Sequence, residues 1–353
     1  MLRALRPRGG KFFTGVVLMH SKRGKFLSIV MALALVACFG AAACAATLNA
    51  YTVMPEKYAS QVFEQFTKDT GIKVNFIRFS SGEALARLTA EKKNPQVDIL
   101  LGGPADVYTA GCDAGVFAEY APKEQALTPA EYRDPGNRWT GIGLIPLCFL
   151  TNTDFLKEHN MKAPESWQDL LDPAYKNGLQ MADARTSGTA TERIYSLIAV
   201  YGVDGAFDYQ KKLHQNIQLY TKSGAGGALP IAQGQAASGI FYLVDALDIV
   251  QQGYPVVITY PKEGVTFGIE ATGIVEGAKN LDEAKAFVDW ATSKKLGELF
   301  LAKKINYIPV VTGLKIDNPA LDTSHVKLLS VGAEHKGDKR KEYVDRWVNE
   351  VIR

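Results

Sequence analysis

The feature of this sequence that most constrains its fold is a regular alternation of strand-like and helix-like segments that begins near residue 48. Short runs rich in apolar and β-branched residues alternate with longer segments in which apolar residues recur at helical spacing. In order, these segments are Leu48 to Val53, Glu56 to Thr70, Ile72 to Phe79, Gly82 to Lys92 and Val97 to Leu101. Such a βαβαβ unit favours parallel strands joined by right-handed crossovers. We therefore expect an α/β protein with mostly parallel sheets flanked by helices.

A long apolar stretch, Gly141 to Thr151, separates this unit from a second alternating series and is suited to cross between two lobes. The segment Val256 to Tyr260 is expected to return the chain to the first lobe. Because the sequence contains no internal repeat, low-complexity segment or linker, the lobes should share two or more crossings. We predict that lobe 1 comprises 47–146 and 262–353, that lobe 2 comprises 147–261, and that a ligand binds in the cleft between them.

The first 46 residues have the pattern of an export signal. A basic stretch, Lys22 to Lys25, leads into an apolar run, Phe26 to Gly40, and then into the small residues Ala41 to Ala46. We expect cleavage near Ala46 and a mature protein in the periplasm. The alternatives are a lipidated N-terminus at Cys38 and a retained membrane anchor, although the apolar run is short and rich in small residues for a membrane span.

Charge and composition exclude several classes of ligand. The chain has 40 Lys and Arg against 37 Asp and Glu, but seven of the basic residues lie in the predicted signal, which contains no acidic residue. The remaining chain is slightly acidic, so nucleic acid is not an expected ligand. Beyond the signal only Cys112 and Cys148 remain, so either one disulfide or two free buried thiols can result. The histidines lack zinc-binding spacing, and we expect neither a cofactor nor a resident metal ion.

Three loops between a predicted strand and a predicted helix contain candidate anion-binding residues. The strongest candidate is the loop from Asp183 to Thr191, which contains Thr186, Ser187, Gly188 and Thr189. Free amides of a first helical turn, the helix dipole and the hydroxyls would all direct donors to one place. This arrangement suits a phosphate, phosphonate or carboxylate group. Plain N-capping of the helix is the alternative interpretation.

The other two loops have a similar composition. Ser80, Ser81 and Gly82 follow a strand of the first lobe, so each lobe supplies donors that could close on one anion. The third loop, Tyr220 to Gly227, contains Ser223 but lacks the glycine and lysine spacing of a nucleotide-binding P-loop. Nucleotide hydrolysis is therefore not indicated. Helix capping in the first case and a flexible turn in the second are the alternatives.

Four further residues are candidates for the rest of a ligand site. Thr52 lies near the end of the first predicted strand, and ligands of open sheets bind at the carboxyl ends of strands. Tyr242, Asp245 and Glu270 lie on or beside the strands that return the chain, where a carboxylate could hold an ammonium group or sugar hydroxyls. A solvated surface carboxylate is the alternative for the acidic residues. The sequence shows no spacing typical of a catalytic triad, and we expect no enzyme activity.

Several short segments together resemble one family. They are Gly102 to Asp106, Pro164 to Trp167, Asp183 to Thr189, Leu213 to Ile217 with Tyr220 to Gly224, and Tyr260 to Gly264 with Ile269 to Thr272. From residue 48 to about 312 the chain is similar to type 2 periplasmic solute-binding proteins, in the branch that includes receptors for ferric iron, phosphonates and sugar phosphates. The resemblance implies a two-lobed periplasmic-binding-protein fold. It also implies a monomeric, non-enzymatic receptor that delivers a solute to an ABC permease in the inner membrane.

Within this branch the resemblance is strongest to receptors for 2-aminoethylphosphonate. Iron-binding members have an adjacent tyrosine pair where this chain has Leu243 and Val244, and sugar-phosphate receptors have a His-Asp pair where it has Val244 and Asp245. An acidic residue common in phosphonate receptors is replaced here by Gly268. The resemblance implies that the Ser and Thr loops hold phosphoryl oxygens, and that Tyr242, Asp245 and Glu270 contact the remainder of the solute.

These observations predict an exported receptor for a small phosphonate or phosphate-ester anion similar to 2-aminoethylphosphonate. A ferric iron receptor is the first alternative, and it would use oxygen ligands near Tyr242. An exported phosphoester hydrolase is the second, and it would need a base or a metal ion near the Ser and Thr loops.

Overall fold

The computed structural model describes residues 46–332, 335 and 337–353. The predicted export signal, with the alternative lipidation site at Cys38, lies in residues 1–45, outside the described residues. In the part of the chain that is described, no helix is long and apolar enough to cross a membrane.

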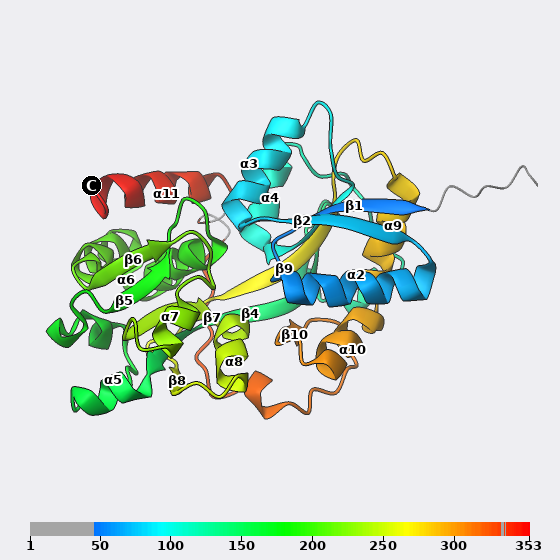
Figure 1. Cartoon of the computed structure of the whole chain (residues 1–353). Coiled ribbons are helices and arrows are strands. Elements are labelled where there is room, and N and C mark those ends of the chain that lie inside the picture. The colour runs from blue at the N-terminus through cyan, green and yellow to red at the C-terminus, as the bar shows by residue number, and fades with distance from the viewer. Residues whose placement is uncertain (1–45, 333–334, 336) are drawn as a thin grey trace, which may run out of the picture. The chain divides into compact units, whose positions relative to one another are not determined.

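The predicted βαβαβ unit is confirmed and forms one end of a long sheet (Figure 1). Its elements are β1 (Thr47–Thr52), α2 (Glu56–Thr70), β2 (Lys73–Arg78), α3 (Ser81–Glu91) and β3 (Ile99–Pro104), and α4 (Ala105–Asp113) follows. β1 lies between β2 and β3 and runs parallel to both. α2 buries Tyr58, Val62 and Phe66 along one face, and it ends at Gly71, whose φ of 77° is the left-handed conformation that favours glycine.

Two long strands occupy the centre of the sheet and make it mixed rather than mostly parallel as predicted. They are β4 (Thr140–Asn152) and β9 (Phe267–Ile274). β9 runs antiparallel to β3 and β4, and β4 runs antiparallel to β7 (Ser238–Tyr242), β8 (Val256–Thr259) and β10 (Ile308–Pro309). The physical reason is that the chain leaves along β4 and returns along β9, so these neighbours are traversed in opposite directions.

The other end of the sheet is again parallel. β5 (Leu179–Ala182) runs parallel to both β6 (Ile217–Thr221) and β7. The helices of this part are α5 (Thr153–Glu158), α6 (Gly188–His214), α7 (Ala228–Ala232) and α8 (Leu243–Gln251). The prediction that the segment Val256 to Tyr260 returns the chain was wrong, because β8 pairs with β4 at Phe149–Asn152 and β9 makes the return.

The C-terminal part of the chain contacts both ends of the sheet. Its helices are α9 (Leu281–Ala291), α10 (Lys294–Lys303) and α11 (Asp338–Glu350). Along the described chain, short 3-10 helices lie at Gln125–Leu127, Ala130–Tyr132, Trp167–Leu171, Pro173–Tyr175 and Pro319–Leu321. α9 packs beside β9, whereas α11 packs on α6 and also reaches β6, where the ring centroids of Trp347 and Tyr220 are 5.0 Å apart. The predicted lobe boundaries stay a prediction, with α11 as a further segment that joins the part containing α6.

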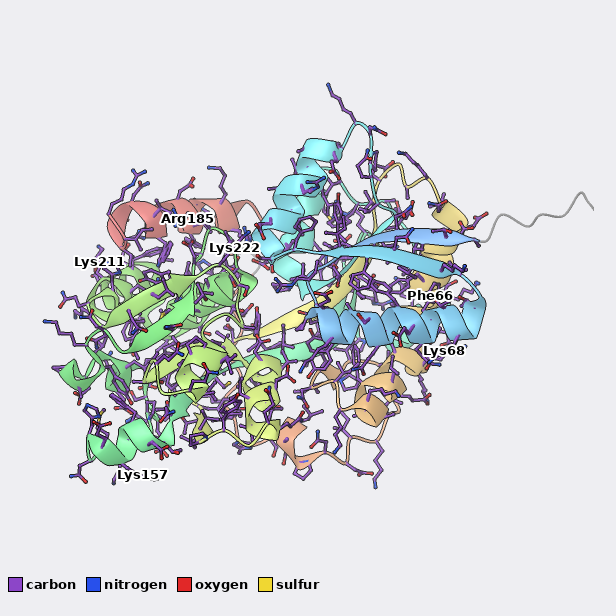
Figure 2. The ribbon with its side chains drawn as sticks, viewed as in Figure 1. Phe66, Lys68, Lys157, Arg185, Lys211 and Lys222 are labelled. Atoms are coloured by element: carbon purple, nitrogen blue, oxygen red, sulfur yellow. The ribbon has the colours of Figure 1, made fainter. Side chains whose placement is uncertain are left out.

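Apolar side chains fill the space between the sheet and its helices. Charged side chains such as Lys68, Lys157 and Lys211 project from the outside of the molecule (Figure 2). In one part of this core the ring of Phe66 lies 5.0 Å from that of Phe287 and 5.6 Å from that of Trp290. Cys112 and Cys148 are both buried and free. Of the two possibilities left by the sequence, two free thiols are therefore observed.

Candidate functional site

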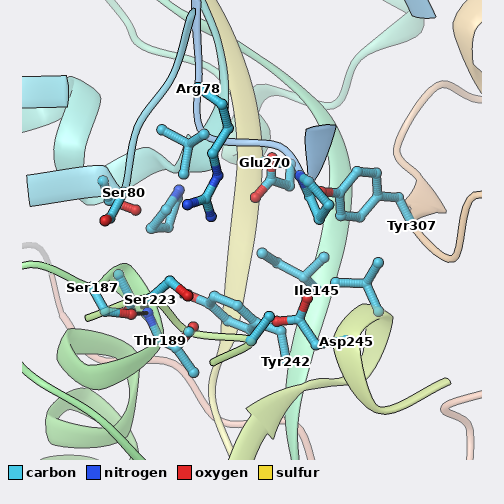
Figure 3. A pocket seen from close by; sticks show the side chains of 18 of the residues that line it. Arg78, Ser80, Ile145, Ser187, Thr189, Ser223, Tyr242, Asp245, Glu270 and Tyr307 are labelled. Carbon is cyan, nitrogen blue, oxygen red and sulfur yellow. Dashed lines mark hydrogen bonds between the residues drawn. The ribbon is translucent and has the colours of Figure 1, made fainter. Parts of the chain in front are cut away.

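A cavity of about 340 Å³ lies where the N-termini of α3, α6 and α8 approach the central strands (Figure 3). Its size falls in the range of small-molecule sites. The lining residues are Val53, Pro55, Glu56, Arg78, Ser80, Ser81, Pro104, Ile145, Ser187, Gly188, Thr189, Ser223, Gly224, Ala225, Tyr242, Val244, Asp245, Glu270 and Tyr307. Most of the residues predicted from the sequence are therefore brought together, including donors from all three Ser and Thr loops.

The α3 side of the cavity is built on a capping box. The Ser80 hydroxyl donates to Glu83 Oε2 at 2.7 Å, and the Ser80 amide donates to the same oxygen at 3.2 Å. A hydrogen bond from Lys222, followed by those from Ser80, lowers the pKa of Glu83, so its carboxylate is charged at neutral pH. Because this carboxylate engages the Ser80 proton, Ser81 is the better hydroxyl donor toward the cavity on this side.

The α6 side offers an unengaged hydroxyl proton. Ser187 caps α6, and its Oγ accepts a hydrogen bond from the Thr189 amide at 3.2 Å. Because Oγ acts as the acceptor there, its own proton remains available to a ligand. The loop that contains Ser223 lies against this turn, since a Cβ built at Gly224 would stand 2.1 Å from Thr189 Oγ1. Glycine is therefore required at position 224 for the two loops to meet.

Arg78 is the one basic residue among the described residues that line the cavity. It ends β2, and its guanidinium points into the cavity (Figure 3). Our sequence predictions missed Arg78, although a signal was present. Along β2 it falls on the same, less exposed face as Val74 and Phe76, and a basic residue on an inward face requires an explanation.

Two carboxylates form the opposite pole of the cavity. Asp245 lies in the first turn of α8 and Glu270 lies on β9, and both are buried. Burial raises the pKa of Asp245 to about 7 and that of Glu270 to about 8. Arg78 opposes the first shift, and the Gly103 amide, which donates to Glu270 Oε2 at 2.8 Å, opposes the second. Either carboxyl group can therefore accept or donate a hydrogen bond near neutral pH.

Two tyrosines complete this pole. The Tyr242 hydroxyl donates to the Gly188 carbonyl at 3.4 Å, and burial raises the pKa of Tyr242 and of Tyr307 well above the usual range. Both are therefore neutral phenols that donate or accept hydrogen bonds. Tyr307 follows α10 and was not predicted, because nothing in its neighbouring sequence indicates that this loop reaches the cavity.

Three predicted residues do not line the cavity. Thr52 is buried within the sheet, where its hydroxyl donates to the Leu101 carbonyl at 3.0 Å. Gly82 and Thr186 instead contact each other, because the Gly82 amide donates to the Thr186 carbonyl at 2.9 Å. The Thr186 hydroxyl donates to the Lys222 carbonyl at 2.6 Å. These two residues join the α3 and α6 loops beside the cavity rather than facing a ligand.

The arrangement has two chemical poles. Ser81, Ser187 and Thr189, the N-terminal ends of α3 and α6, and Arg78 supply donors and one positive charge. Asp245 and Glu270 supply acceptors, or donors when protonated. Such a cavity suits a small solute with an anionic group at one end and hydrogen-bonding or cationic groups at the other.

Comparisons of sequence agree with the fold. Residues 94–331 match the family model of bacterial extracellular solute-binding proteins. An uncharacterized protein of Haemophilus influenzae is 33% identical over 295 residues, which are 81% of this chain and 85% of that protein. A putative 2-aminoethylphosphonate-binding periplasmic protein of Salmonella typhimurium is 32% identical over 155 residues, 44% of this chain and 43% of that protein. The Fe(3+)-binding periplasmic protein of Serratia marcescens is 26% identical over 280 residues, 76% of this chain and 81% of that protein.

Solved structures give the same result. The periplasmic binding protein AfuA of Actinobacillus pleuropneumoniae, solved with exogenous fructose 6-phosphate, is 33% identical with a TM-score of 0.84, covering 87% of this chain and 99% of AfuA. Iron-bound HitA of Pseudomonas aeruginosa, at 19% identity and a TM-score of 0.69 over 78% of this chain and 90% of HitA, shares the fold. The predicted two-lobed, type 2 periplasmic-binding-protein fold is thus confirmed, and this chain belongs to the bacterial extracellular solute-binding proteins.

Proposed function

We propose that this protein is the periplasmic receptor of an ABC importer and captures a small phosphonate or phosphate ester for delivery to an inner-membrane permease. The observation that supports this proposal is the convergence of hydroxyl groups, two helix N-termini and Arg78 on one side of a single cavity. The receptor would bind its solute between the two sets of loops and bury it by closing around it.

A phosphoryl group matches the donor pole in charge and in geometry. Its oxygens can accept hydrogen bonds from several directions, and it carries up to two negative charges near neutral pH. Helix N-termini favour such a group through free amides and the helix dipole. Arg78 can form charge-assisted hydrogen bonds to two of its oxygens. A carboxylate would use fewer of these donors.

The acidic pole favours a solute whose other end is rich in donors. An ammonium group, as in 2-aminoethylphosphonate, would pair with Asp245 or Glu270, and sugar hydroxyls would donate to the same oxygens. The names of relatives support both possibilities, because one is described as a 2-aminoethylphosphonate-binding protein and AfuA was solved with fructose 6-phosphate. We favour the aminophosphonate, since two buried carboxylates gain most from a cationic partner.

Ferric iron is less well matched to this cavity. Tyrosinate oxygen is a strong ligand for Fe³⁺, but burial raises the pKa of Tyr242 and of Tyr307, which disfavours the phenolate form. Leu243 and Val244 stand where the resemblance to iron receptors would place a tyrosine pair, and their side chains contain no oxygen ligands. A hydrolase would need a base or a metal ion near the Ser and Thr loops, whereas the carboxyl groups of Asp245 and Glu270 belong to the opposite pole, and the described residues contain no cluster of metal ligands.

Calorimetric titration tests the proposal directly. Wild-type protein would be titrated with 2-aminoethylphosphonate, fructose 6-phosphate, glycerol phosphate, inorganic phosphate and ferric citrate. We expect 2-aminoethylphosphonate to bind, and Arg78→Gln to weaken that binding roughly tenfold to a hundredfold, because hydrogen bonds to charged groups contribute about 1.5–3 kcal/mol. Arg87→Gln is the matched control, since Arg87 lies outside the cavity and pairs with Glu91. Binding of ferric citrate alone would refute the proposal.

A further inference from the structure

Asp106 is buried behind the cavity wall, and its contacts with α6 and α11 bring three helices together. It lies in the first turn of α4 and does not line the cavity. Its Oδ2 accepts hydrogen bonds from Arg340 Nε at 3.0 Å, Thr191 Oγ1 at 3.3 Å and the Tyr195 hydroxyl at 3.4 Å. Arg340 is also buried, with 9% of its side chain exposed. A charged residue is seldom buried so completely without a partner, and here the partner comes from the far end of the chain.

The three helices belong to different parts of the fold. α4 follows β3 at one end of the sheet, whereas α6 lies at the other end, and α11 is carried on α6 (Figure 1). Arg346 of α11 pairs with Asp204 of α6 at 2.9 Å, and its guanidinium lies 4.2 Å from the ring centroid of Phe207. α6 and α11 therefore form one unit, and the Asp106–Arg340 ion pair joins this unit to α4.

The same contacts continue into the cavity wall. Thr191 Oγ1 donates to the Gly188 carbonyl at 2.9 Å in addition to contacting Asp106. Pro104, at the N-terminus of α4, and Gly188, at the N-terminus of α6, both line the cavity. They are in close contact, because a Cβ built at Gly188 would stand 2.6 Å from Pro104 Cγ. The ion pair thus lies directly behind the place where the two walls of the cavity meet.

We propose that Asp106 and Arg340 form a closure latch, a pair of positioning residues that holds the α6 N-terminus against α4 and so sets the spacing of the anion-binding donors. Because Arg340 lies on α11, this helix would take part in closure. It rests on the proposed capture of a solute by closure, but not on the identity of that solute. No function assigned above uses either residue.

The burial of the pair explains why it would act as a latch. A buried ion pair is favourable only while both partners are together, and removing one partner leaves an uncompensated charge. If the walls separate, Asp106 loses its contact with Arg340 and its hydrogen bonds from Thr191 and Tyr195 together, so these contacts are made only in the closed form. Among the described residues, Asp106 Oδ1 and Arg340 Nη2 are buried without a hydrogen-bond partner. The pair is joined by one charge-assisted hydrogen bond, from Arg340 Nε to Asp106 Oδ2.

Chemical cross-linking can measure closure without any solute. Lys222 Nζ, in the loop after β6, and Glu83 Oε1, in the first turn of α3, are 2.6 Å apart, and both side chains reach solvent. In the full chain with Cys38 and Cys44 replaced by serine, Glu83→Cys and Lys222→Cys would be joined by a short bismaleimide. The rate of cross-linking reports the fraction of molecules in which the loops are together.

The double variant Asp106→Asn/Arg340→Gln leaves no unpaired buried charge and should fold. We expect it to slow cross-linking roughly tenfold, as the loss of a coupled buried pair implies. Lys341→Gln is the matched control, because it removes an exposed ion pair within the same helix, Lys341 to Asp345, that reaches neither α4 nor α6. Its cross-linking rate should equal that of the parent chain.

A cross-linking rate unchanged in the double variant would overturn the latch, whether or not the protein binds a phosphoryl compound. Equal slowing in the double variant and in Lys341→Gln would also overturn it, since that result would indicate a general loosening of α11. Failure of the proposed function would appear separately, as an absence of binding in the titration of the wild-type protein.

Discussion

Replacing Gly82 with alanine should weaken solute binding without weakening the fold. Gly82 lies in the first turn of α3 and its amide donates to the Thr186 carbonyl at 2.9 Å. A Cβ at this position would stand 2.7 Å from the Arg185 carbonyl oxygen and 3.2 Å from Thr186 Cα. These are backbone atoms that cannot rotate away, so the α3 and α6 loops must move apart.

The size of the effect follows from two losses. The hydrogen bond contributes about 1 kcal/mol, and overpacking at a close contact costs about 1–3 kcal/mol. A penalty of about 2 kcal/mol on the closed form corresponds to roughly thirtyfold weaker binding. In an open form the contact with α6 is absent, and alanine is favoured over glycine within a helix by up to about 1 kcal/mol.

Stopped-flow measurement with a phosphoryl compound that binds the wild-type protein would separate the rates. We expect Gly82→Ala to raise the dissociation rate constant while the association rate constant changes little, since closure follows encounter. Thr89→Ala, on the same helix and outside the cavity, is the control. Wild-type affinity in Gly82→Ala would refute the assignment of this contact to closure.

Three further outcomes are expected. Because burial raises the pKa of Asp245 to about 7 and that of Glu270 to about 8, the folded protein retains protons that the unfolded chain releases above about pH 4. Urea unfolding should therefore show a free energy of unfolding that falls as the pH rises from about 5 to about 8, and Asp245→Asn/Glu270→Gln should lose most of this dependence. Cys112 and Cys148 should resist an aromatic disulfide reagent in the native protein and react after unfolding, measured in a chain whose other cysteines are serine, because burial raises the pKa of both thiols. A double variant Arg78→Gln/Asp245→Asn should bind 2-aminoethylphosphonate more weakly than either single variant by calorimetry, since the two side chains face opposite ends of the solute; equal affinities would contradict the two-pole interpretation.

Much of the site was visible in local sequence patterns. Ser80, Ser187 and Ser223 stand in short polar loops between apolar segments, and helix capping depends on contacts within one or two turns. Asp245 and Glu270 were suggested by the resemblance and by their place beside the returning strands. Arg78 could have been found by the same reasoning, since it occupies an inward position on a strand that was correctly predicted.

Other predictions failed where contacts between distant segments decide the outcome. The strand at Val256–Thr259 had the right composition, yet its partner is β4, and composition does not specify which neighbour a strand selects. Thr52 has the right residue type at the right end of a strand, but its hydroxyl is satisfied within the sheet. Tyr307 reaches the cavity from the loop after α10, and no local spacing predicts such an approach.

The sequence by itself determined the α/β alternation and the hydroxyl-rich helix starts, because periodicity and capping act over a few residues. Only the tertiary structure decided that Arg78 faces the α6 turn, that Gly82 meets Thr186, and that Asp106 pairs with Arg340, which lies 234 residues further along the chain. The order of strands in the sheet brings these residues together, and that order is selected by the packing of the whole core rather than by any one segment.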